Sequence, residues 1–351
     1  MNNFWEQLPK PFFVLAPLAN VTDAAFRRVI AKYSKTDGAM PYVTYTEFVS
    51  ADGLVLAGQE GRAKLMRDLV FTGAERPIVA QFFTSTPEHM EKAAALAQEL
   101  GFDGVDINMG CPDKTIEKQG AGAKLMLNSA LAVQIIEAAK RGAQRLPISV
   151  KTRLGYNKDI LDEWLPALLA AKPAAITLHA RTRKEMSKVP AQWERIKRAV
   201  EIRNELCSNT LIIGNGDVKD VEDARQKIKE TGADGAMLGR AIFGRPWLFA
   251  EEKLPEKSLG GGGQREHFGD KDFFQEVFRR LRILVEHTKL FEELLGDIKS
   301  FAIMKKHFKA YCEGFPGAKE LRIQLMETSS AAEVERLVEE YILKNNEKGE
   351  Y

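Results

Sequence analysis

The stretch Asp103–Gly122, DGVDINMGCPDKTIEKQGAG, decides how this chain folds. Its apolar run at residues 104–108 is too short for a helix and stops at Gly110 and Pro112, which are typical of turns. This pattern predicts a short buried strand that ends in a loop carrying Cys111. In barrels of alternating strands and helices, catalytic residues lie at that end of the strands.

Seven further apolar segments repeat this pattern on both sides of the stretch, and all except the weaker one at 43–46 are followed by an assigned helical pattern. Several are apolar throughout, as expected for strands covered on both faces. The count favours an α/β fold of the (β/α)8 TIM-barrel class, with the last helix expected at residues 246–251. The expected strands are residues 12–16, 43–46, 77–83, 104–108, 147–151, 175–179, 210–213 and 235–238.

A doubly wound open sheet is the alternative architecture. It would place a glycine fingerprint after the first strand, but residues 16–19 read Ala-Pro-Leu-Ala. A second candidate, Gly214-Asn215-Gly216, has Lys219 where the third glycine should stand. The sequence therefore favours the closed barrel.

The composition changes after Lys253. Residues 258–264 contain four consecutive glycines, and the pattern from residue 272 onward is helical without strands. We predict a barrel domain at 1–252, a glycine-rich linker at 253–271 and a small all-helical C-terminal domain at 272–351. Its helices are expected at residues 273–287, 291–295, 298–311, 318–326 and 331–343.

Composition narrows the functional classes. The 351 residues are 44% hydrophobic and 28% charged, with a net charge of +2, so any nucleic-acid surface must be a local patch. Residues 1–10 show no secretory pattern, and no apolar run reaches the length of a membrane span. Cys111, Cys207 and Cys312 are widely separated, and the histidines lack ligand spacing. We expect a cytoplasmic monomer without disulfides, metal or membrane contact.

Polar side chains stand at or just after the ends of six predicted strands. A single such residue is usually a loop hydrogen-bonder, but the strand ends of a barrel converge on one mouth. We therefore expect one site built from Gln81, Asn108 with Cys111, Lys151 with Arg153, His179 with Arg181, Asn215 with Asp217, and Arg240.

The types of these residues suggest a ligand with a phosphate and a heterocycle. Residues 214–217 and Gly239-Arg240 follow the seventh and eighth strands, where barrels bind phosphate, although two ordinary tight turns would look the same. Lys151 and His179 could face a ring that becomes anionic on reduction. Gln81 offers an amide that both donates and accepts, which suits the edge of a heterocycle.

Cys111 is the candidate for chemistry. Most lone cysteines are inert buried residues, but this one lies in a Gly-Cys-Pro turn beyond a strand. An unperturbed thiol is mostly protonated at neutral pH and can act as a general acid, or as a nucleophile if a base lowers its pKa. The residues alone do not choose between these two roles. Cys207 and Cys312 fall in helical patterns and are expected to be structural.

The helical tail interleaves basic and aromatic residues. Such a run is often only a solvated face, yet here it is appended to a barrel with its own site, so binding to a phosphate backbone is an equal alternative. The residues concerned are Lys299, Lys305, Lys306, Lys309, Lys319, Arg322, Phe301, Phe308, Tyr311 and Phe315.

Six blocks of sequence together resemble the tRNA-dihydrouridine synthases, flavoenzymes that reduce specific uridines in tRNA. The resemblance covers about residues 12–249, and a weaker match, Lys-Lys-His-Phe at 305–308, extends into the helical tail. The signature around Cys111 is the most specific block. In order, the blocks are LAPLANVTD at 15–23, DINMGCP at 106–112, VKTR at 150–153, LHARTR at 178–183, NGD at 215–217 and GRA at 239–241.

This resemblance implies that FMN lies on the barrel mouth. Its ring would contact Ala16, Pro17 and Leu18. Three side chains would bind its polar edge, namely Gln81, Lys151 and His179, with the lysine countering the charge of the reduced form. The phosphate region would be held by Asn215, Gly216, Asp217, Gly239 and Arg240.

The resemblance also implies a reaction. NADPH, or NADH, would reduce the flavin, and a uridine, expected in the D-loop, would be extruded from the tRNA into the pocket. Hydride would pass to C6 of uracil while Cys111 protonates C5 and Asn108 holds the base. The tRNA contacts would include Arg153, Arg181, Lys305 and Lys306.

Two other functions compete with this one. A flavin barrel that reduces a free pyrimidine would use Cys111 in the same way, but the basic tail would then have no purpose. A tRNA-binding or folding factor would use the tail, with only incidental catalysis. The loop at 184–191 also differs from the Tyr-x-Gly loop of many bacterial members, so the sequence does not identify the uridine that is modified.

Overall fold

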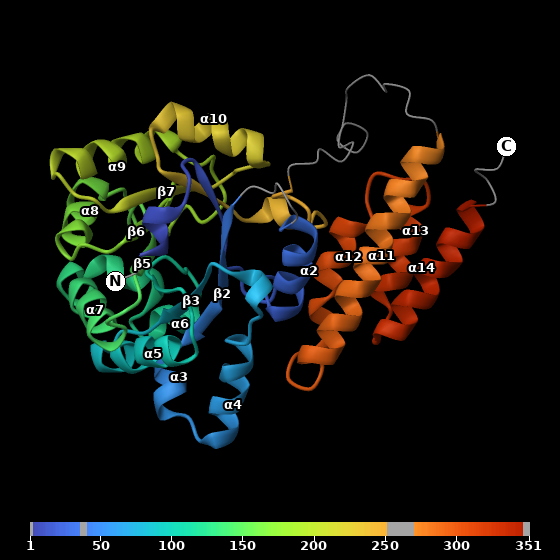
Figure 1. Cartoon of the computed structure of the whole chain (residues 1–351), viewed down its shortest axis with the longest axis horizontal. Coiled ribbons are helices and arrows are strands. Elements are labelled where there is room, and N and C mark those ends of the chain that lie inside the picture. The colour runs from blue at the N-terminus through green and yellow to red at the C-terminus, as the bar shows by residue number, and fades with distance from the viewer. Residues whose placement is uncertain (1–2, 36–40, 251–269, 347–351) are drawn as a thin grey trace. The chain divides into compact units, whose positions relative to one another are not determined.

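The computed structural model describes residues 3–35, 41–250 and 270–346. Eight parallel strands close into a barrel in sequential order, β1 to β8, with β1 pairing β8 (Figure 1). The predicted (β/α)8 class is therefore confirmed. The strands are β1 Phe12–Leu15, β2 Tyr42–Ser50, β3 Ile78–Phe83, β4 Gly104–Asn108, β5 Ile148–Arg153, β6 Ala175–His179, β7 Leu211–Asn215 and β8 Gly235–Leu238.

The strands of the barrel are buried on both faces, which explains their nearly continuous apolar runs. In β4, Val105 and Ile107 belong to the large core that the strands share with the surrounding helices. Because side chains alternate along a strand, Asp106 and Asn108 occupy the opposite face, toward the interior of the barrel. Asp106 pairs in register with Gln81 of β3 and Ser149 of β5, so polar residues of neighbouring strands share one level.

Helices surround the strands, and several begin at a residue whose side chain accepts a backbone N–H. Asn128 caps α7 and Asp220 caps α10 in this way. Two helices after β2, α3 and α4, were not predicted. The helix predicted at 246–251 is wrong for its described part, because residues 246–249 form turns. The helices are α1 Phe4–Gln7, α3 Ala51–Leu56, α4 Gln59–Asp68, α5 Pro87–Glu99, α6 Lys114–Lys118, α7 Ser129–Gly142, α8 Leu161–Ala170, α9 Trp193–Glu205 and α10 Val221–Thr231, with 3-10 turns at η1 Gly73–Glu75, η2 Gly122–Leu127 and η3 Arg240–Ile242.

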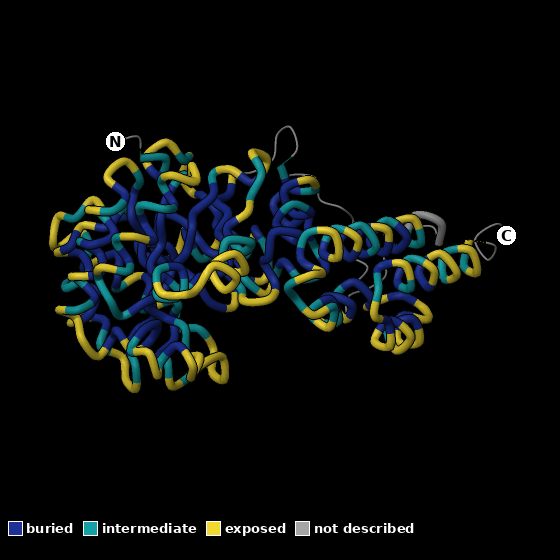
Figure 2. Tube along the Cα trace, turned by 90° about the horizontal axis from the view of Figure 1, so that it is seen from below, coloured by how far each residue is buried: buried dark blue, intermediate teal, exposed yellow. Residues whose placement is uncertain are grey.

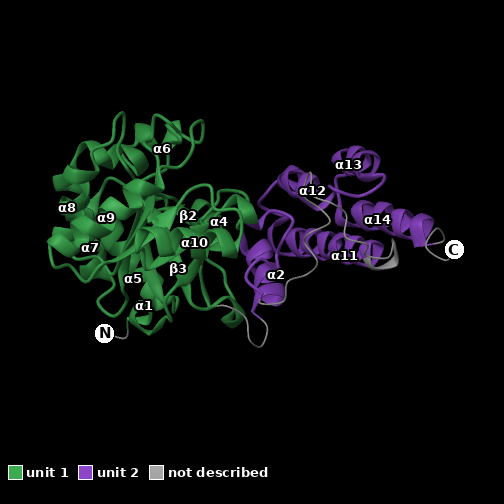
Figure 3. Cartoon of the chain, turned by 90° about the horizontal axis from the view of Figure 1, so that it is seen from above, with its two compact units in different colours: residues 1–22, 40–241 green, residues 23–39, 242–351 purple. Residues whose placement is uncertain are grey.

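The chain divides into two compact units (Figure 3). The first contains residues 1–22 and 40–241, and the second contains residues 23–39 and 242–351. Helix α2, Ala24–Ser34, therefore follows the first barrel strand in sequence but packs against α11, Asp270–Leu295, of the second unit. The predicted domain boundaries stay predictions, and the predicted linker at 253–271 lies outside the described residues up to residue 269.

The second unit is helical in the part of the chain that the structure describes, as predicted, and each unit has its own buried interior (Figure 2). The two helices predicted at 273–287 and 291–295 form one continuous helix, α11. The segment predicted at 298–311 begins instead with a 3-10 turn. These elements are α11 Asp270–Leu295, η5 Phe301–Ile303, α12 Lys305–Tyr311, α13 Ala318–Met326 and α14 Ala331–Asn346.

A histidine pair lies in the core of this helical unit. His287 and His307 are fully buried, with ring centroids 4.6 Å apart, and the ring of Phe26 lies 4.7 Å from each. Among the described residues, the ring nitrogens of both histidines and the hydroxyl of Tyr311 have no hydrogen-bond partner. Burial lowers the pKa of His307 to about 3 and holds the pKa of His287 well below its usual range. Both rings are therefore neutral in the folded unit.

Acidification should destabilise the helical unit through this pair. The unfolded chain binds protons near pH 6.5 and the folded unit does not, so the free energy of unfolding falls as the pH drops through that value. We expect a loss of about 2 kcal/mol per histidine between pH 7 and pH 5. Chemical denaturation at both pH values measures it. The double variant His287→Phe/His307→Phe should lose most of this pH dependence, and an unchanged dependence would contradict the assignment.

Candidate active site

Two amide side chains at the barrel mouth hold the loop that carries Cys111. The Asn108 Oδ1 atom accepts the backbone N–H groups of Gly110 at 3.1 Å and Cys111 at 2.9 Å. Its Nδ2 atom donates to Oε1 of Gln81 at 3.1 Å. Asn108 and Gln81 are both buried. A residue at the end of β4 thus fixes the start of the loop, and a residue of β3 fixes that residue in turn.

Beneath these amides lies a carboxyl group that the sequence analysis missed. Asp106 is fully buried and accepts from Gln81 Nε2 and from Ser149 Oγ, each at 2.6 Å. Burial raises the pKa of Asp106 to about 6, against the lowering effect of these hydrogen bonds and of Lys151. The available signal was its position two residues before Asn108, which places both side chains on the same face of the strand.

The thiol of Cys111 is partly buried and remains protonated at neutral pH. Burial is the main cause that raises its pKa above the ordinary value, and it outweighs a hydrogen bond from the Asp113 backbone, which lowers the pKa more than the Asp113 charge raises it. Lys151 and Arg153 act in the opposite direction without overcoming burial. The group can therefore act as a proton donor, whereas a thiolate nucleophile would need a lowered pKa.

Lys151 brings a cation into the mouth that forms no ion pair among the described residues, although the charge of Asp106 is close enough to raise its pKa. Its Nζ atom lies 3.4 Å from Oδ1 of Asn215, whose Nδ2 donates to the Met237 carbonyl at 2.8 Å. Burial, followed by the charge of Arg153, lowers the pKa of Lys151 to about 8. At neutral pH this ammonium is still mostly charged, and an anionic ligand would stabilise it.

Arg153 is directed at backbone carbonyls from two loops. Its guanidinium donates to Gly110 at 2.8 Å, to Thr182 at 3.3 Å and to Met186 at 3.1 Å. Burial lowers the pKa of Arg153 to about 10, so it stays charged. The residue therefore ties the Cys111 loop to the loop after β6, and its predicted contact with substrate stays a prediction.

A second network joins the ends of β6, β7 and β8. Arg181 is almost fully buried and forms an ion pair with Asp217, whose other oxygen accepts from Arg240 at 2.7 Å. The two guanidinium groups, chiefly Arg181, hold the pKa of Asp217 below its usual range. Arg181 also lies 3.1 Å from Nε2 of His179. Since arginine only donates, Nε2 must accept, and the histidine keeps its proton on Nδ1.

Two of the predicted phosphate-binding glycines differ in their surroundings. Gly216 has φ = +120°, and a Cβ there would lie 2.8 Å from the side chain of Ala191, so only glycine fits. A Cβ at Gly239 would make only ordinary van der Waals contacts, with Ala16 at 3.6 Å and Leu18 at 3.9 Å. These contacts bring the turn after β8 next to the turn after β1, and Pro17 lies between those two neighbours in sequence.

The Cys111 loop is also held from its far side. The Arg183 guanidinium pairs with both oxygens of Glu117 in α6 and lies 4.9 Å from the ring of Tyr156. Residues after β4, β5 and β6 are thus connected to one another. Arg183 was visible in the sequence as part of the block at 178–183, but its partner Glu117 carried no signal.

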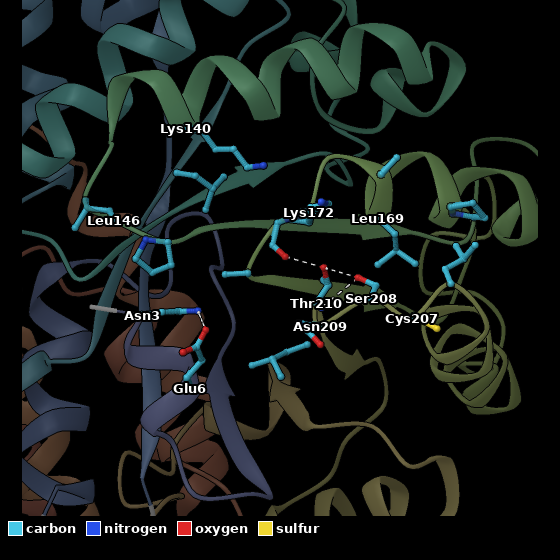
Figure 4. Close-up of a pocket in the computed structure, with 18 of the residues that line it drawn as sticks. Asn3, Glu6, Lys140, Leu146, Leu169, Lys172, Cys207, Ser208, Asn209 and Thr210 are labelled. Atoms are coloured by element: carbon cyan, nitrogen blue, oxygen red, sulfur yellow. Dashed lines mark hydrogen bonds between the residues drawn. The ribbon is translucent and has the colours of Figure 1, made fainter. Parts of the chain in front are cut away.

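The opposite end of the barrel has a cavity of about 840 Å³ (Figure 4). Several of its polar lining groups are paired with each other or with backbone. Thr210 Oγ1 donates to the Pro173 carbonyl at 2.8 Å and accepts from Ser208 at 3.1 Å, while Asn3 donates to Glu6 at 2.9 Å. The charged lining residues of the cavity include Glu6 and Lys140, and the Lys140 ammonium donates to the Ala171 carbonyl.

The predicted tRNA contacts on the helical unit lie on α12. Lys306 is exposed and Lys305 is partly exposed. The next two residues, His307 and Phe308, are buried, so the helix has one face in the core and one basic face toward solvent.

The closed barrel, with a thiol and several cations at its mouth, has the architecture of a (β/α)8-barrel enzyme whose mouth could bind an anionic group. The family described as "Dihydrouridine synthase (Dus)" matches residues 14–347. The chain belongs to this family of oxidoreductases.

Curated relatives cover nearly the whole chain. The probable tRNA-dihydrouridine synthase of Staphylococcus aureus (strain COL) is 39% identical over 97% of this chain and 95% of its own. The probable tRNA-dihydrouridine synthase 2 of Bacillus subtilis (strain 168) is also 39% identical, over 97% and 96%. The resemblance drawn from the six blocks is therefore confirmed at the level of the family.

The described residues, 3–35, 41–250 and 270–346, contain neither a membrane-spanning helix nor a candidate metal cluster. No described helix is both long and apolar enough to cross a membrane. Within the same ranges, no group of three or more His, Cys, Asp or Glu side chains is arranged to hold a metal ion.

Asp217 should contribute to stability through its two arginine partners. The variant Asp217→Asn leaves the Arg181 guanidinium without its anion, and we expect the free energy of unfolding to fall by about 2 kcal/mol. Urea denaturation measures this. The control is Asp162→Asn, which removes an exposed carboxylate that also pairs with two arginines. It should cost under about 1 kcal/mol, and equal losses would refute the expectation.

Proposed function

We propose that this protein is an FMN-dependent, NADPH-using tRNA-dihydrouridine synthase that reduces the C5–C6 double bond of a uridine in the D-loop of tRNA. Family membership supports the reaction class and a flavin cofactor. The observation that carries the proposal is the position of Cys111, whose backbone Asn108 holds at the mouth of a closed barrel that also presents Lys151 and Arg153.

The residues at the mouth fit a flavin with a terminal phosphate. Gln81 keeps one N–H and one carbonyl lone pair after its contacts with Asp106 and Asn108. Lys151 is a cation with no carboxylate partner among the described residues, and His179 retains its Nδ1–H. These groups would hold the polar edge of the ring, with Ala16, Pro17 and Leu18 against its face. Asn215, Gly216, Gly239 and Arg240 would surround the phosphate, and Asp217 would orient the arginines.

When bound and reduced, the flavin supplies the hydride that adds to C6 of uracil. Addition at C6 places negative charge on C5 and the adjacent carbonyl, so a proton must reach C5. Cys111 would donate it as general acid, which its raised pKa favours. Asn108 would hold the uracil and the backbone of the Cys111 loop together. Arg153 and Arg181 would neutralise phosphates near the target nucleotide.

Cys111 provides the test of this reaction. The variant Cys111→Ala removes the proton donor, and we expect dihydrouridine formation to fall about 10²–10⁴-fold, while tRNA binding stays within about twofold. Mass spectrometry of tRNA and a filter-binding assay measure the two quantities. The matched control, Cys207→Ala, removes an exposed thiol at the other end of the barrel and should leave both unchanged.

The bound cofactor and the preferred reductant can be identified on the purified protein. It should be yellow and release FMN on denaturation, and NADPH should bleach it faster than NADH does. Undiminished activity of the Cys111→Ala variant would refute the general-acid role, and release of FAD would refute the cofactor assignment.

The helical unit should bind the tRNA backbone through α12. The double variant Lys305→Glu/Lys306→Glu should weaken tRNA binding and reduce the slope of log K against log salt by about two. A salt titration measures the slope. Lys92→Glu/Lys197→Glu changes the net charge equally on two barrel helices and should leave the slope nearly unchanged. If both double variants lower the slope equally, α12 contributes only through the net charge of the protein, and the proposed contact with tRNA is wrong.

A further inference from the structure

Three side chains form one hydrogen-bonded chain from the barrel interior to the Cys111 loop. Asp106 Oδ2 accepts from Gln81 Nε2 at 2.6 Å, and Gln81 Oε1 accepts from Asn108 Nδ2 at 3.1 Å. Asn108 Oδ1 then accepts the backbone N–H groups of Gly110 and Cys111. The side chains of Asp106 and Gln81 are fully buried, so water does not compete for these contacts.

The direction of every bond in this chain is set at Asp106. A carboxylate only accepts, whereas an amide has one donating end and one accepting end. Gln81 must therefore turn its nitrogen toward Asp106 and its oxygen toward Asn108. Asn108 must in turn give its nitrogen to Gln81 and its oxygen to the loop. The reverse orientation would place the Asn108 amide nitrogen against two backbone N–H groups.

Burying the Asp106 carboxylate lowers the stability of the fold, so a purely structural role does not explain it. Among the described residues it forms no ion pair, and its second oxygen is satisfied by Ser149 Oγ at 2.6 Å. The titratable groups that face it are Tyr45 of β2 and Lys151 of β5. A buried charge without an ion-pair partner destabilises a fold, and an apolar residue would fill a barrel core at lower cost. The retained carboxylate therefore points to a role at the site.

The orientation also decides what Asn108 can offer a substrate. Both lone pairs of its Oδ1 are used by the loop, and one Nδ2 hydrogen is used by Gln81. One N–H remains. Uracil presents carbonyl oxygens, and negative charge develops on one of them as hydride adds to C6, so an N–H donor there stabilises the transition state.

We propose that Asp106 is a positioning residue for uridine reduction: through Gln81 it orients Asn108 so that Asn108 holds the Cys111 loop and presents an N–H to the uracil carbonyl. This inference rests on the proposed function. It concerns the step in which tRNA is reduced and does not require any change in how the flavin is reduced.

A reciprocal exchange tests the direction of the chain. The variant Gln81→Glu sets two carboxylates against each other, and one of them must take up a proton or move away. Adding Asp106→Asn restores the pairing, because the new amide donates to the new carboxylate, which still accepts from Asn108. Both proteins lack the same Gln81 amide, so comparing them isolates the polarity of the pair.

The rate of tRNA reduction per bound flavin is the first readout. At pH 8 we expect Gln81→Glu to be on the order of tenfold or more slower than the wild type, and the double variant to be about tenfold faster than Gln81→Glu. In a protein that keeps Gln81, the single variant Asp106→Asn should not reduce tRNA faster than the wild type. This reversal of sign is the signature of a coupled pair. Because Gln81 is also placed at the polar edge of the flavin, the rate of flavin reduction by NADPH is compared only between the two proteins that share Gln81→Glu. Between them it should change by less than about threefold, which is less than the change in tRNA reduction.

Two further readouts separate positioning from stability. Alkylation of Cys111 by iodoacetamide, without tRNA, should accelerate in Gln81→Glu as the loop loses its support, and return toward the wild-type rate in the double variant. As the pH falls from 8 to 5.5, a shared proton should recover the rate of Gln81→Glu relative to wild type, and the double variant should gain nothing. Thermal unfolding midpoints that track all the rates would reduce Asp106 to a structural role and overturn the proposal.

The control is a surface pair in which an amide donates to a carboxylate over the same hydrogen-bond distance. Gln226 donates to Glu230 at 2.6 Å on α10, and Gln226→Glu should change none of the readouts. If the wild-type protein forms dihydrouridine but Gln81→Glu and the double variant behave alike, this inference fails alone. If the wild type forms none, the proposed function fails first.

Discussion

The site depends on one side-chain oxygen, Oδ1 of Asn108, and the two backbone N–H groups that it accepts. Hydrogen bonds between neighbouring strands fix the backbone only where the strands pair. Cys111 lies three residues beyond Asn108, in a turn. The Asn108 side chain accepts the backbone N–H groups that no neighbouring strand can accept there, and it thereby fixes the loop backbone to the barrel. Arg153 and Arg183 then hold the same loop from other sides. A thiol on a loop is thereby positioned by rigid strands.

Charge at the mouth is balanced unevenly, and the imbalance is what a phosphate-bearing ligand requires. Asp217 neutralises part of the charge of Arg181 and Arg240, while Lys151 and Arg153 meet only neutral oxygens among the described residues. The cost of burying these cations appears as their lowered pKa values. An anionic ligand would recover part of that cost on binding, because its charge would favour the protonated forms of both side chains.

The sequence predicted all eight strands, because buried parallel strands read as short apolar runs bounded by turn residues. It also predicted which strand ends carry polar groups, since parallel strands bring those ends to one edge. It did not predict α3 and α4, which follow a strand that extends further than its apolar run. Nor could it predict that α2 packs with the C-terminal helices, because that contact depends on residues almost 250 positions away in sequence.

Asp106, Ser149 and Glu117 were missed for a different reason. Each lies in or beside a block that was noticed, but their importance comes from partners on other strands and loops. A period of two along β4 was enough to place Asp106 on the same face as Asn108. What the period cannot supply is the direction of a hydrogen bond, which depends on whether the next strand offers a donor or an acceptor. That information exists only once Gln81 and Asp106 are known to share one level of the barrel.

The competition between burial, which raises the pKa of Cys111, and the Asp113 backbone N–H with two nearby cations, which lower it, decides the chemistry available to this thiol. Two cations close to a thiol would ordinarily favour the thiolate, and a thiolate cannot give a proton to C5 of uracil. Here the Arg153 guanidinium is directed at carbonyl oxygens, and Lys151 toward Asn215, so neither donates a hydrogen bond to the sulfur in this structure. The two cations therefore lower the pKa of the thiol only through the electrostatic effect of their charges, and desolvation outweighs that effect. The same contacts that order the loops thus keep the cations available to a ligand while leaving the proton on the sulfur.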